Sequence, residues 1–289
     1  MNIGVELHLS TGVKEMKDSS FSEVVYPTVV SLSDAGCDND LAKRIRQEPD
    51  RAVQAMRREF SGGHEAQPLV VQQPLILSGF TRTTFDLEAL LQDWTEYYNE
   101  RWGIKGFNPC LRQFQVPDGL APDFSWGVVL PTKDVGITAQ RVYNKLGEDF
   151  RMYKWFNESL EDVLDPEKEA RPLGDQPQII LCRNLIEADH QHKNQSANKI
   201  TEANINAMGL LERLLLEDFV VVFQKWAEHL DVVNVTLCAG SRDHHGSVPS
   251  VVWLPDDRGI YVGWCRPGDR HDGLRVREVV PLQLLQEAA

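Results

Sequence analysis

The most apolar stretch of the chain lies between residues 206 and 229. Apolar residues recur there at intervals of three and four, in two adjoining stripes, a spacing typical of an α-helix. Polar side chains occupy only a narrow remaining strip, namely Arg213, Glu217, Gln224 and Glu228. A helix with so wide an apolar arc contacts more than one neighbour. The pattern therefore predicts one long buried helix over residues 206–229.

Three apolar runs of strand length follow this helix, at residues 232–238, 248–253 and 260–264. The tetrapeptide Asp256-Asp257-Arg258-Gly259 lies between the last two runs and is typical of a β-hairpin turn. Runs of strands beside runs of helices, without a repeated β-α-β pattern, favour an α+β fold over a doubly wound sheet. We therefore expect a mixed or antiparallel sheet packed on the long helix.

Two earlier helices are indicated by the residues that flank them. Asp86 precedes a periodic segment rich in Leu, Trp and Tyr that ends near Gly103, and Thr138 precedes a second periodic segment. Asp and Thr are favoured at the N-cap of a helix, and Gly is favoured just past its end. Aromatic residues at helical spacing predict a core face rather than a stacking site for a ligand.

Residues 1–66 are predicted to form a smaller, less regular N-terminal region with one basic helix at 40–60. The Lys and Arg residues of this helix alternate with acidic residues, which indicates a solvated helix face with salt bridges. The Gly-containing, polar stretch at 61–68 is typical of a linker. The sequence therefore predicts two parts, an N-terminal region 1–66 and a main α+β domain 67–289.

Composition and charge limit the classes of function. The 289-residue chain is 42% hydrophobic and has a formal net charge of −13. This charge argues against generic nucleic-acid binding, which relies on neutralising phosphates with Lys and Arg. No apolar run reaches the ~18 residues of a membrane span, and the first residues lack the profile of a secretory signal. We therefore expect a cytoplasmic protein without a membrane segment.

Motifs for common cofactors are absent from the sequence. Neither G-x-G-x-x-G nor G-x-x-x-x-G-K-[ST] occurs, which argues against the ordinary dinucleotide and P-loop sites. The five cysteines include no C-x-x-C pair, which favours reduced, buried thiols over a disulfide framework or a zinc ribbon.

Two clusters of His and Asp are candidate metal ligands. One cluster follows a predicted strand at 178–183, and the other lies in the loop between the strands at 232–238 and 248–253. Imidazole and carboxylate groups can bind a divalent metal ion that activates water, so convergence of the two loops predicts a hydrolase or nuclease. The alternative is that both clusters are polar loops and that the protein has no cofactor. The candidate ligands are Asp189, His190, His192, Asp243, His244 and His245.

The second loop and two C-terminal arginines are also candidate binding residues. Arg suits bidentate contact with a carboxylate or phosphate, and the final third of the chain is locally basic. The alternative is that nearby aspartates pair with these arginines. The candidate binding residues are Ser241, Arg242, Asp243, His244, His245, Arg275 and Arg277. We expect a binding or assembly protein without catalytic activity, which contacts a protein partner or a second copy of itself.

Four segments in the C-terminal third carry a resemblance to known sequences: Ser196-Ala197-Asn198, Leu210-Leu211-Glu212-Arg213-Leu214-Leu215, Asn234-Val235-Thr236-Leu237-Cys238-Ala239-Gly240-Ser241-Arg242 and Asp272-Gly273-Leu274-Arg275-Val276-Arg277. On these segments, residues 187–280 resemble a family of uncharacterised bacterial proteins. The resemblance implies that Gly240-Ser241-Arg242 and Arg275-x-Arg277 belong to one recurring module. It implies no catalytic role.

Overall fold

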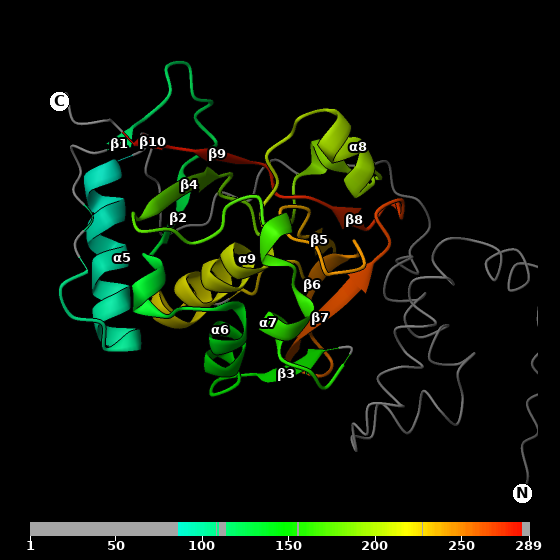
Figure 1. Cartoon of the computed structure of the whole chain (residues 1–289), viewed down its shortest axis with the longest axis horizontal. Coiled ribbons are helices and arrows are strands. Elements are labelled where there is room, and N and C mark those ends of the chain that lie inside the picture. Colours follow the sequence, from blue (N-terminus) through cyan, green and yellow to red (C-terminus); the bar gives the residue numbers. More distant parts are fainter. Residues whose placement is uncertain (1–85, 108, 110–113, 155, 227, 285–289) are drawn as a thin grey trace, which may run out of the picture.

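The structure is a computed structural model that describes residues 86–284 except 108, 110–113, 155 and 227 (Figure 1). The expected N-terminal region 1–66, with its basic helix and linker, lies outside the described residues. The described chain mixes helices and strands, as expected for an α+β fold. None of its helices is both long enough and apolar enough to cross a membrane.

The larger of the two main sheets has five strands and is mixed. The strands are β3 (Arg151–Lys154), β5 (Val235–Leu237), β6 (Val248–Leu254), β7 (Gly259–Cys265) and β8 (Leu274–Arg275). Their order is β3-β7-β6-β5-β8, with β3 parallel to β7, β8 parallel to β5 and β6 antiparallel to both of its neighbours. The pairing of β6 with β7 across a four-residue turn confirms the predicted hairpin.

The smaller main sheet has three antiparallel strands in the order β2-β4-β9. These are β2 (Trp126–Leu130), β4 (Gln178–Cys182) and β9 (Val279–Pro281). Every residue of β2 and all but the first of β4 are buried, as expected for strands covered on both faces. A separate pair joins β1 (Phe114–Gln115) to β10 (Gln283–Leu284).

Five α-helices are described. They are α5 (Leu87–Trp102), α6 (Ala139–Leu146), α7 (Leu160–Val163), α8 (Ala197–Glu202) and α9 (Leu210–Glu217). The side chain of Asp86 accepts a hydrogen bond from the amide of Ala89, and that of Thr138 accepts one from the amide of Arg141. Both predicted N-caps are therefore confirmed.

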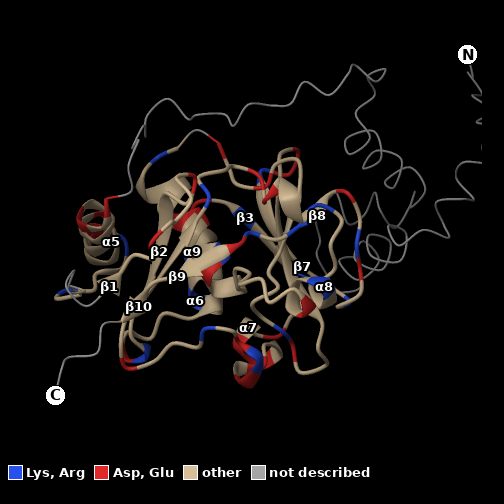
Figure 2. Ribbon diagram, turned by 90° about the horizontal axis from the view of Figure 1, so that it is seen from above, with Lys and Arg blue, Asp and Glu red and all other residues tan. Residues whose placement is uncertain are grey.

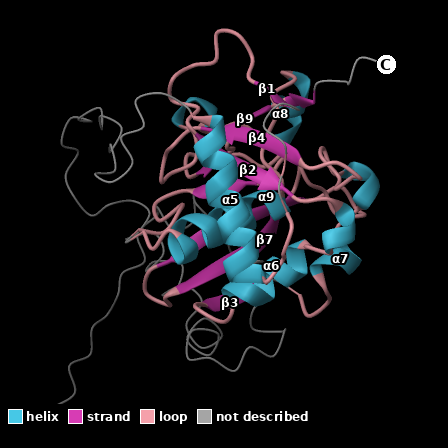
Figure 3. Cartoon of the chain, turned by 90° about the vertical axis from the view of Figure 1, so that its left-hand side faces the viewer, coloured by secondary structure: helices cyan, strands magenta, loops and turns pink. Residues whose placement is uncertain are grey.

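Helix α9 lies between the two main sheets. Figure 3 shows β9, β4 and β2 on one side of it and β7 and β3 on the other, and α9 contacts both β2 and β6. The helix continues directly into a π-helical segment, Asp218–Phe223. Leu210, Leu214 and Leu215 are fully buried, so the helix occupies the centre of the described fold.

The prediction of one helix over residues 206–229 is not confirmed. Before Leu210 the chain is extended, because the carbonyl of Asn206 accepts from the amide of Val279 at 2.8 Å and the amide of Met208 donates to the carbonyl of Arg277 at 2.9 Å. Backbone groups engaged in this way are not free for a helical turn. At the other end Lys225 has a φ of 56°, a left-handed conformation that a right-handed helix does not contain.

The aromatic face of α5 forms part of the core, as predicted. The ring of Trp94 stacks on that of Phe219 with centroids 4.2 Å apart. The indole nitrogen of Trp94 donates to the carbonyl of Gly127 at 2.9 Å, and the hydroxyl of Tyr98 donates to the carbonyl of Val129 at 2.7 Å. These bonds satisfy the polar atoms of buried aromatic side chains and fix α5 against β2.

Candidate functional site

The loop that follows β5 is more buried than a binding loop is expected to be. Ser241 is fully buried, and its hydroxyl donates to Oε2 of Glu169 at 2.7 Å and accepts from the amide of Leu210 at 2.8 Å. Asp243 is buried too, and its Oδ1 accepts from the amides of His245 and Ser247 at 2.8 and 2.7 Å. Ser241 and Asp243 therefore maintain the conformation of the loop and its attachment to the core.

The remaining predicted residues of this loop are more accessible. Arg242 is half-buried, and its Nη1 donates to the carbonyls of Ala239 at 2.6 Å and Ser241 at 2.8 Å. His244 and His245 are exposed. The two imidazoles are therefore the part of the predicted binding loop that faces solvent.

The two C-terminal arginines lie in different environments. Arg277 is 1% exposed and donates to Oδ1 of Asp231 at 2.7 Å and to the carbonyl of Leu185 at 2.8 Å. Arg275 is half-buried on the edge strand β8, and its Nε is buried without a hydrogen-bond partner in the described chain. Arg277 belongs to the interior and is not available to a partner at the surface.

A buried network of charges surrounds Arg277, and the sequence analysis missed it. Asp231 also accepts from Nε of Arg213 at 2.8 Å, and Nη1 of Arg213 donates to Oε2 of Glu217 at 2.8 Å. Nδ1 of His229 lies 2.8 Å from the other oxygen of Glu217. Burial alone would raise the pKa of Asp231, but the charges of Arg277 and Arg213 outweigh it and lower the pKa. The sequence signal was an Arg and a Glu four residues apart in an otherwise apolar helix.

Asp189 and His192 lie beside Glu278, a residue that the sequence analysis did not select. One ligand atom from each of the three lies within 4.8 Å of the others, and Nε2 of His192 is 3.2 Å from Oε2 of Glu278. In the described ranges this is the one group of three or more such side chains with metal-ligand spacing. The other predicted ligands, His190, Asp243, His244 and His245, are not members of it.

A guanidinium group lies between the two carboxylates of this group. Nη1 of Arg183 donates to Oδ2 of Asp189 at 2.7 Å and to Oε2 of Glu278 at 3.0 Å. Burial raises the pKa of Asp189, while the Glu278 amide and the charge of Arg183 oppose that rise. Nδ1 of His192 is buried without a hydrogen-bond partner in the described chain. A divalent cation would fit these three ligands only after Arg183 moves away.

Glu169 is the carboxyl group of the described chain with the clearest shift toward neutral pH. Burial, more than any other cause, raises its pKa to about 7, although the hydrogen bond from Ser241 opposes the rise. Its Oε1 is buried and accepts no hydrogen bond in the described chain. The sequence does not indicate this residue, because nothing in an acidic loop shows which carboxylate the fold will bury.

The buried cysteines are not candidate nucleophiles. Cys182, Cys238 and Cys265 are free thiols in the interior. Burial raises the pKa of Cys182 and Cys265 to about 12 and that of Cys238 further still. Since the thiolate is the reactive form, these thiols are inert at neutral pH in the folded chain, which agrees with the predicted role of small buried hydrophobic residues.

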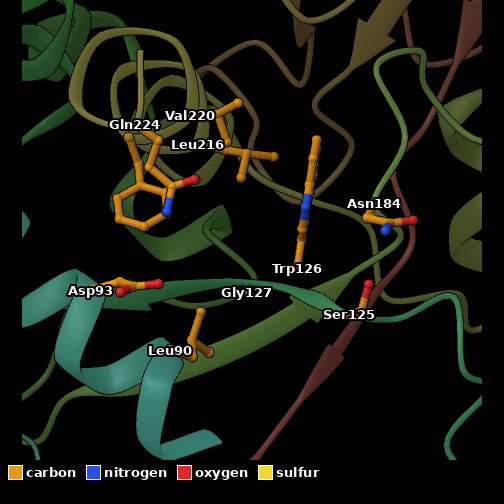
Figure 4. A pocket seen from close by; sticks show the side chains of 10 residues that line it. Leu90, Asp93, Ser125, Trp126, Gly127, Asn184, Leu216, Val220 and Gln224 are labelled. Carbon is orange, nitrogen blue, oxygen red and sulfur yellow. The ribbon is translucent and has the colours of Figure 1, made fainter. Parts of the chain in front are cut away.

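A pocket opens where α5, β2 and the π-helical segment meet (Figure 4). Its empty space is about 460 Å³, part of it open to solvent, and about 30 Å³ of it can hold the centre of a water molecule. Figure 4 shows the indole of Trp126 between Leu216 and Val220 on one side and Asn184 and Ser125 on the other. The remaining lining residues are Leu90, Asp93, Gly127, Phe219 and Gln224.

Three polar side chains at this pocket have no hydrogen-bond partner in the described chain. The hydroxyl of Ser125 and the carboxamides of Asn184 and Gln224 form no hydrogen bond within the described chain. The carboxylate of Asp93 adds an acidic group at the rim. An apolar floor with a few convergent polar groups is the usual composition of a small-molecule site.

The pocket is also the place where the central helix departs from regular geometry. Phe219 and Val220 lie in the π-helical segment, and Gln224 follows its last residue directly. π-helical turns are rare and occur frequently at functional sites. The amide of Gln224 donates to the carbonyl of Phe219 at 2.9 Å, five residues earlier. The wider turn thus sets the position of three lining side chains.

Comparison of the chain with models of protein families, with curated proteins and with solved structures gave no match in any of the three. The resemblance of residues 187–280 to a bacterial family therefore stays a prediction.

Proposed function

We propose that the protein is a binding protein whose ligand enters the pocket between α5, β2 and the π-helical segment. The observation that carries the proposal is the set of uncommitted polar groups of Ser125, Asn184 and Gln224 over an apolar floor. Polar groups without protein partners bind water or a ligand. The binding role expected from the sequence is kept, but its place moves, because Ser241, Asp243 and Arg277 are buried in internal contacts.

The lining residues favour a neutral or cationic ligand. The described lining residues include Asp93 but no Lys, Arg or His, so they offer a phosphate or carboxylate no cationic partner. Carboxamides and a hydroxyl both donate and accept hydrogen bonds. The volume of about 30 Å³ that can hold the centre of a water molecule admits one or two water-sized groups. The ligand therefore inserts a small substituent and lies mainly across the mouth, against the apolar lining.

Thermal-shift screening with matched ligand pairs tests the proposal, because a ligand that binds the native state raises the melting temperature. The pairs are nucleosides with their monophosphates, sugars with their phosphates, and amines with the corresponding carboxylates. We expect a neutral or cationic member to stabilise the chain more than its anionic counterpart. The shift should disappear in Asn184→Ala and Gln224→Ala and persist in Gln176→Ala, an exposed glutamine outside the pocket.

The proposal is wrong if the anionic members stabilise best, or if the shifts survive in both pocket variants. Failure of the whole panel to shift the melting temperature also counts against a small-molecule site of this class.

The second candidate is a metal-dependent hydrolase or nuclease. The observation that favours it is the group Asp189, His192 and Glu278, whose mixed oxygen and nitrogen ligands suit a divalent ion. It ranks below binding because Arg183 already pairs with both carboxylates. Metal analysis of the purified protein and melting with and without a chelator test it. A bound divalent ion lost in Glu278→Gln would support the enzyme, and no ion with no chelator effect would refute it.

A further inference from the structure

Residues 163–171, which we call the strap, lie across the loop 240–244. The strap begins at Val163, the last residue of α7, and contains the short helical turn Pro166–Lys168. Figure 2 shows acidic residues gathered on α7 and the chain around it. Three backbone hydrogen bonds attach the strap to the loop: Asp165 N to Arg242 O at 2.9 Å, Ala170 N to Gly240 O at 2.8 Å and His244 N to Val163 O at 3.3 Å.

Glu169 faces the interior, as do two other residues of the strap: Leu164, which lies in the hydrophobic core, and Arg171, which pairs with Glu212. Its Oε2 accepts from the hydroxyl of Ser241 at 2.7 Å, and Ser241 in turn accepts from the amide of Leu210 at the start of α9. Its Oε1 is buried without a partner in the described chain. One carboxyl group therefore links the strap, the loop and the central helix, with half of its hydrogen-bonding capacity unused.

Within the described residues no cation forms an ion pair with Glu169, although the charges of Arg171 and Arg242 act to lower its pKa. Arg171 donates to both oxygens of Glu212 at 2.5 and 2.7 Å, and Nη1 of Arg242 donates to two backbone carbonyls. Glu212 is itself a second carboxylate near Glu169, and its charge contributes to raising the pKa of Glu169. Ionised Glu169 is therefore a buried charge beside a like charge, a combination that favours the protonated form.

We propose that the strap is a pH-sensitive cover, which protonated Glu169 holds closed over the loop 240–244 and ionised Glu169 releases. Release moves the carboxylate into water, where both of its oxygens are solvated, and uncovers Ser241 and the first turn of α9. The pKa of Glu169, about 7, sets the change near neutral pH.

Other charged groups at the strap lie toward its outer face. Nζ of Lys168 is 2.8 Å from Oδ2 of Asp165, and Nδ1 of His244 is 3.8 Å from the same oxygen. The side chain of His244 is 54% exposed. Asp243 in the loop directs its Oδ1 to amides of its own loop. His244 is thus an imidazole at the outer face of the strap, and the experiment controls for it with a variant.

Hydrogen exchange of the strap amides at about pH 6 and about pH 8 tests the cover, after correction for the pH dependence of intrinsic exchange. The pKa of Glu169 is about 7 in the closed state and 4.5 in the open state. The equilibrium constant for opening of the strap therefore rises about tenfold between pH 6 and pH 8. We expect this rise for the amides of Asp165 and Ala170. The backbone amides that pair β6 with β7 serve as the reference, and their corrected exchange rates should be the same at both pH values.

Three variants separate Glu169 from its neighbours. Glu169→Gln should remove the tenfold rise, whereas Glu167→Gln, an exposed carboxylate of the same strap, and His244→Gln should keep it. Equal corrected exchange of the wild-type strap at both pH values overturns the proposal, and so does a rise of equal size in the β6–β7 amides. If Glu169→Gln keeps the rise while His244→Gln loses it, the proposal is wrong and His244 is the titrating group.

Discussion

Replacement of Asp231 by Asn is the sharpest test of the buried charge network. Asp231 is fully buried and accepts hydrogen bonds from Arg213 at 2.8 Å and Arg277 at 2.7 Å. Asn has nearly the same shape but no charge, so the change leaves two buried guanidinium groups, of which Arg213 keeps its ion pair with Glu217 and Arg277 loses its own. Removing one partner of a buried ion pair costs about 3–5 kcal/mol, because the other charge stays buried and unpaired.

The lower end of that range applies here, because the amide oxygen of Asn still accepts one hydrogen bond. A loss of about 3 kcal/mol corresponds to a fall in melting temperature of roughly 6–12 °C for a domain of 150–250 residues. Urea unfolding followed by circular dichroism measures the free energy of unfolding of wild type and variant. The matched control is Asp175→Asn, whose carboxylate is 81% exposed and pairs with an exposed lysine, and which should not change stability measurably.

A loss below about 1 kcal/mol for Asp231→Asn would refute the reasoning, since it would mean that the arginines are solvated or paired elsewhere. The double variant Asp231→Asn with Arg277→Met gives an independent check. The two changes remove an interacting pair, so their combined cost should be smaller than the sum of the single costs. Strict additivity would show that Asp231 and Arg277 do not interact.

Three further predictions concern other parts of the interior. Glu169 has a higher pKa in the folded chain than its value of 4.5 in the unfolded chain. The stability that it contributes is therefore greatest below pH 4.5 and falls by about 3 kcal/mol as the pH rises to 7. Urea unfolding of Glu169→Gln should lack this pH-dependent loss of stability. Gly240→Ala would place a Cβ 2.6 Å from the carbonyl oxygen of Ala207 and should lower the free energy of unfolding by roughly 1–3 kcal/mol, as measured by thermal unfolding. The control is Gly268→Ala, whose Cβ would meet no atom within 4 Å and which should melt as wild type does. Cys238 should be alkylated by iodoacetamide, as followed by mass spectrometry, only at the rate at which the chain opens.

The sequence predicted those features of the helices and strands that depend on residues close together in the chain. The caps Asp86 and Thr138, the end of α5 near Gly103 and the β6–β7 hairpin are set by residues a few positions apart, and all are confirmed. The prediction of the long helix was wrong at both ends. At its start the reason is non-local, because Asn206 pairs with Val279 at the start of β9 and Met208 pairs with Arg277, contacts across about 70 residues that no local pattern contains. At its end, apolar periodicity extends past Phe223 but Lys225 takes a left-handed conformation.

The candidate site was harder to predict, because burial decides which polar residues are free to act. The sequence marked Ser241, Asp243 and Arg277 as chemically capable, and the fold uses all three for internal hydrogen bonds. The sequence gave no reason to select Glu278 or Glu169. Their hydrogen-bond partners, Arg183 and Ser241, lie 95 and 72 residues away along the chain.

A polar side chain is informative about ligand binding to the extent that the fold leaves it without a partner. Arg213, Asp231 and Arg277 are fully hydrogen-bonded in the interior, so their chemistry serves stability, although their residue types are those of active sites. Asn184 and Gln224 are less reactive, yet their carboxamides line an open pocket and form no hydrogen bond within the described residues. Such groups are available to water or to a ligand, and for this reason the proposed binding role rests on them.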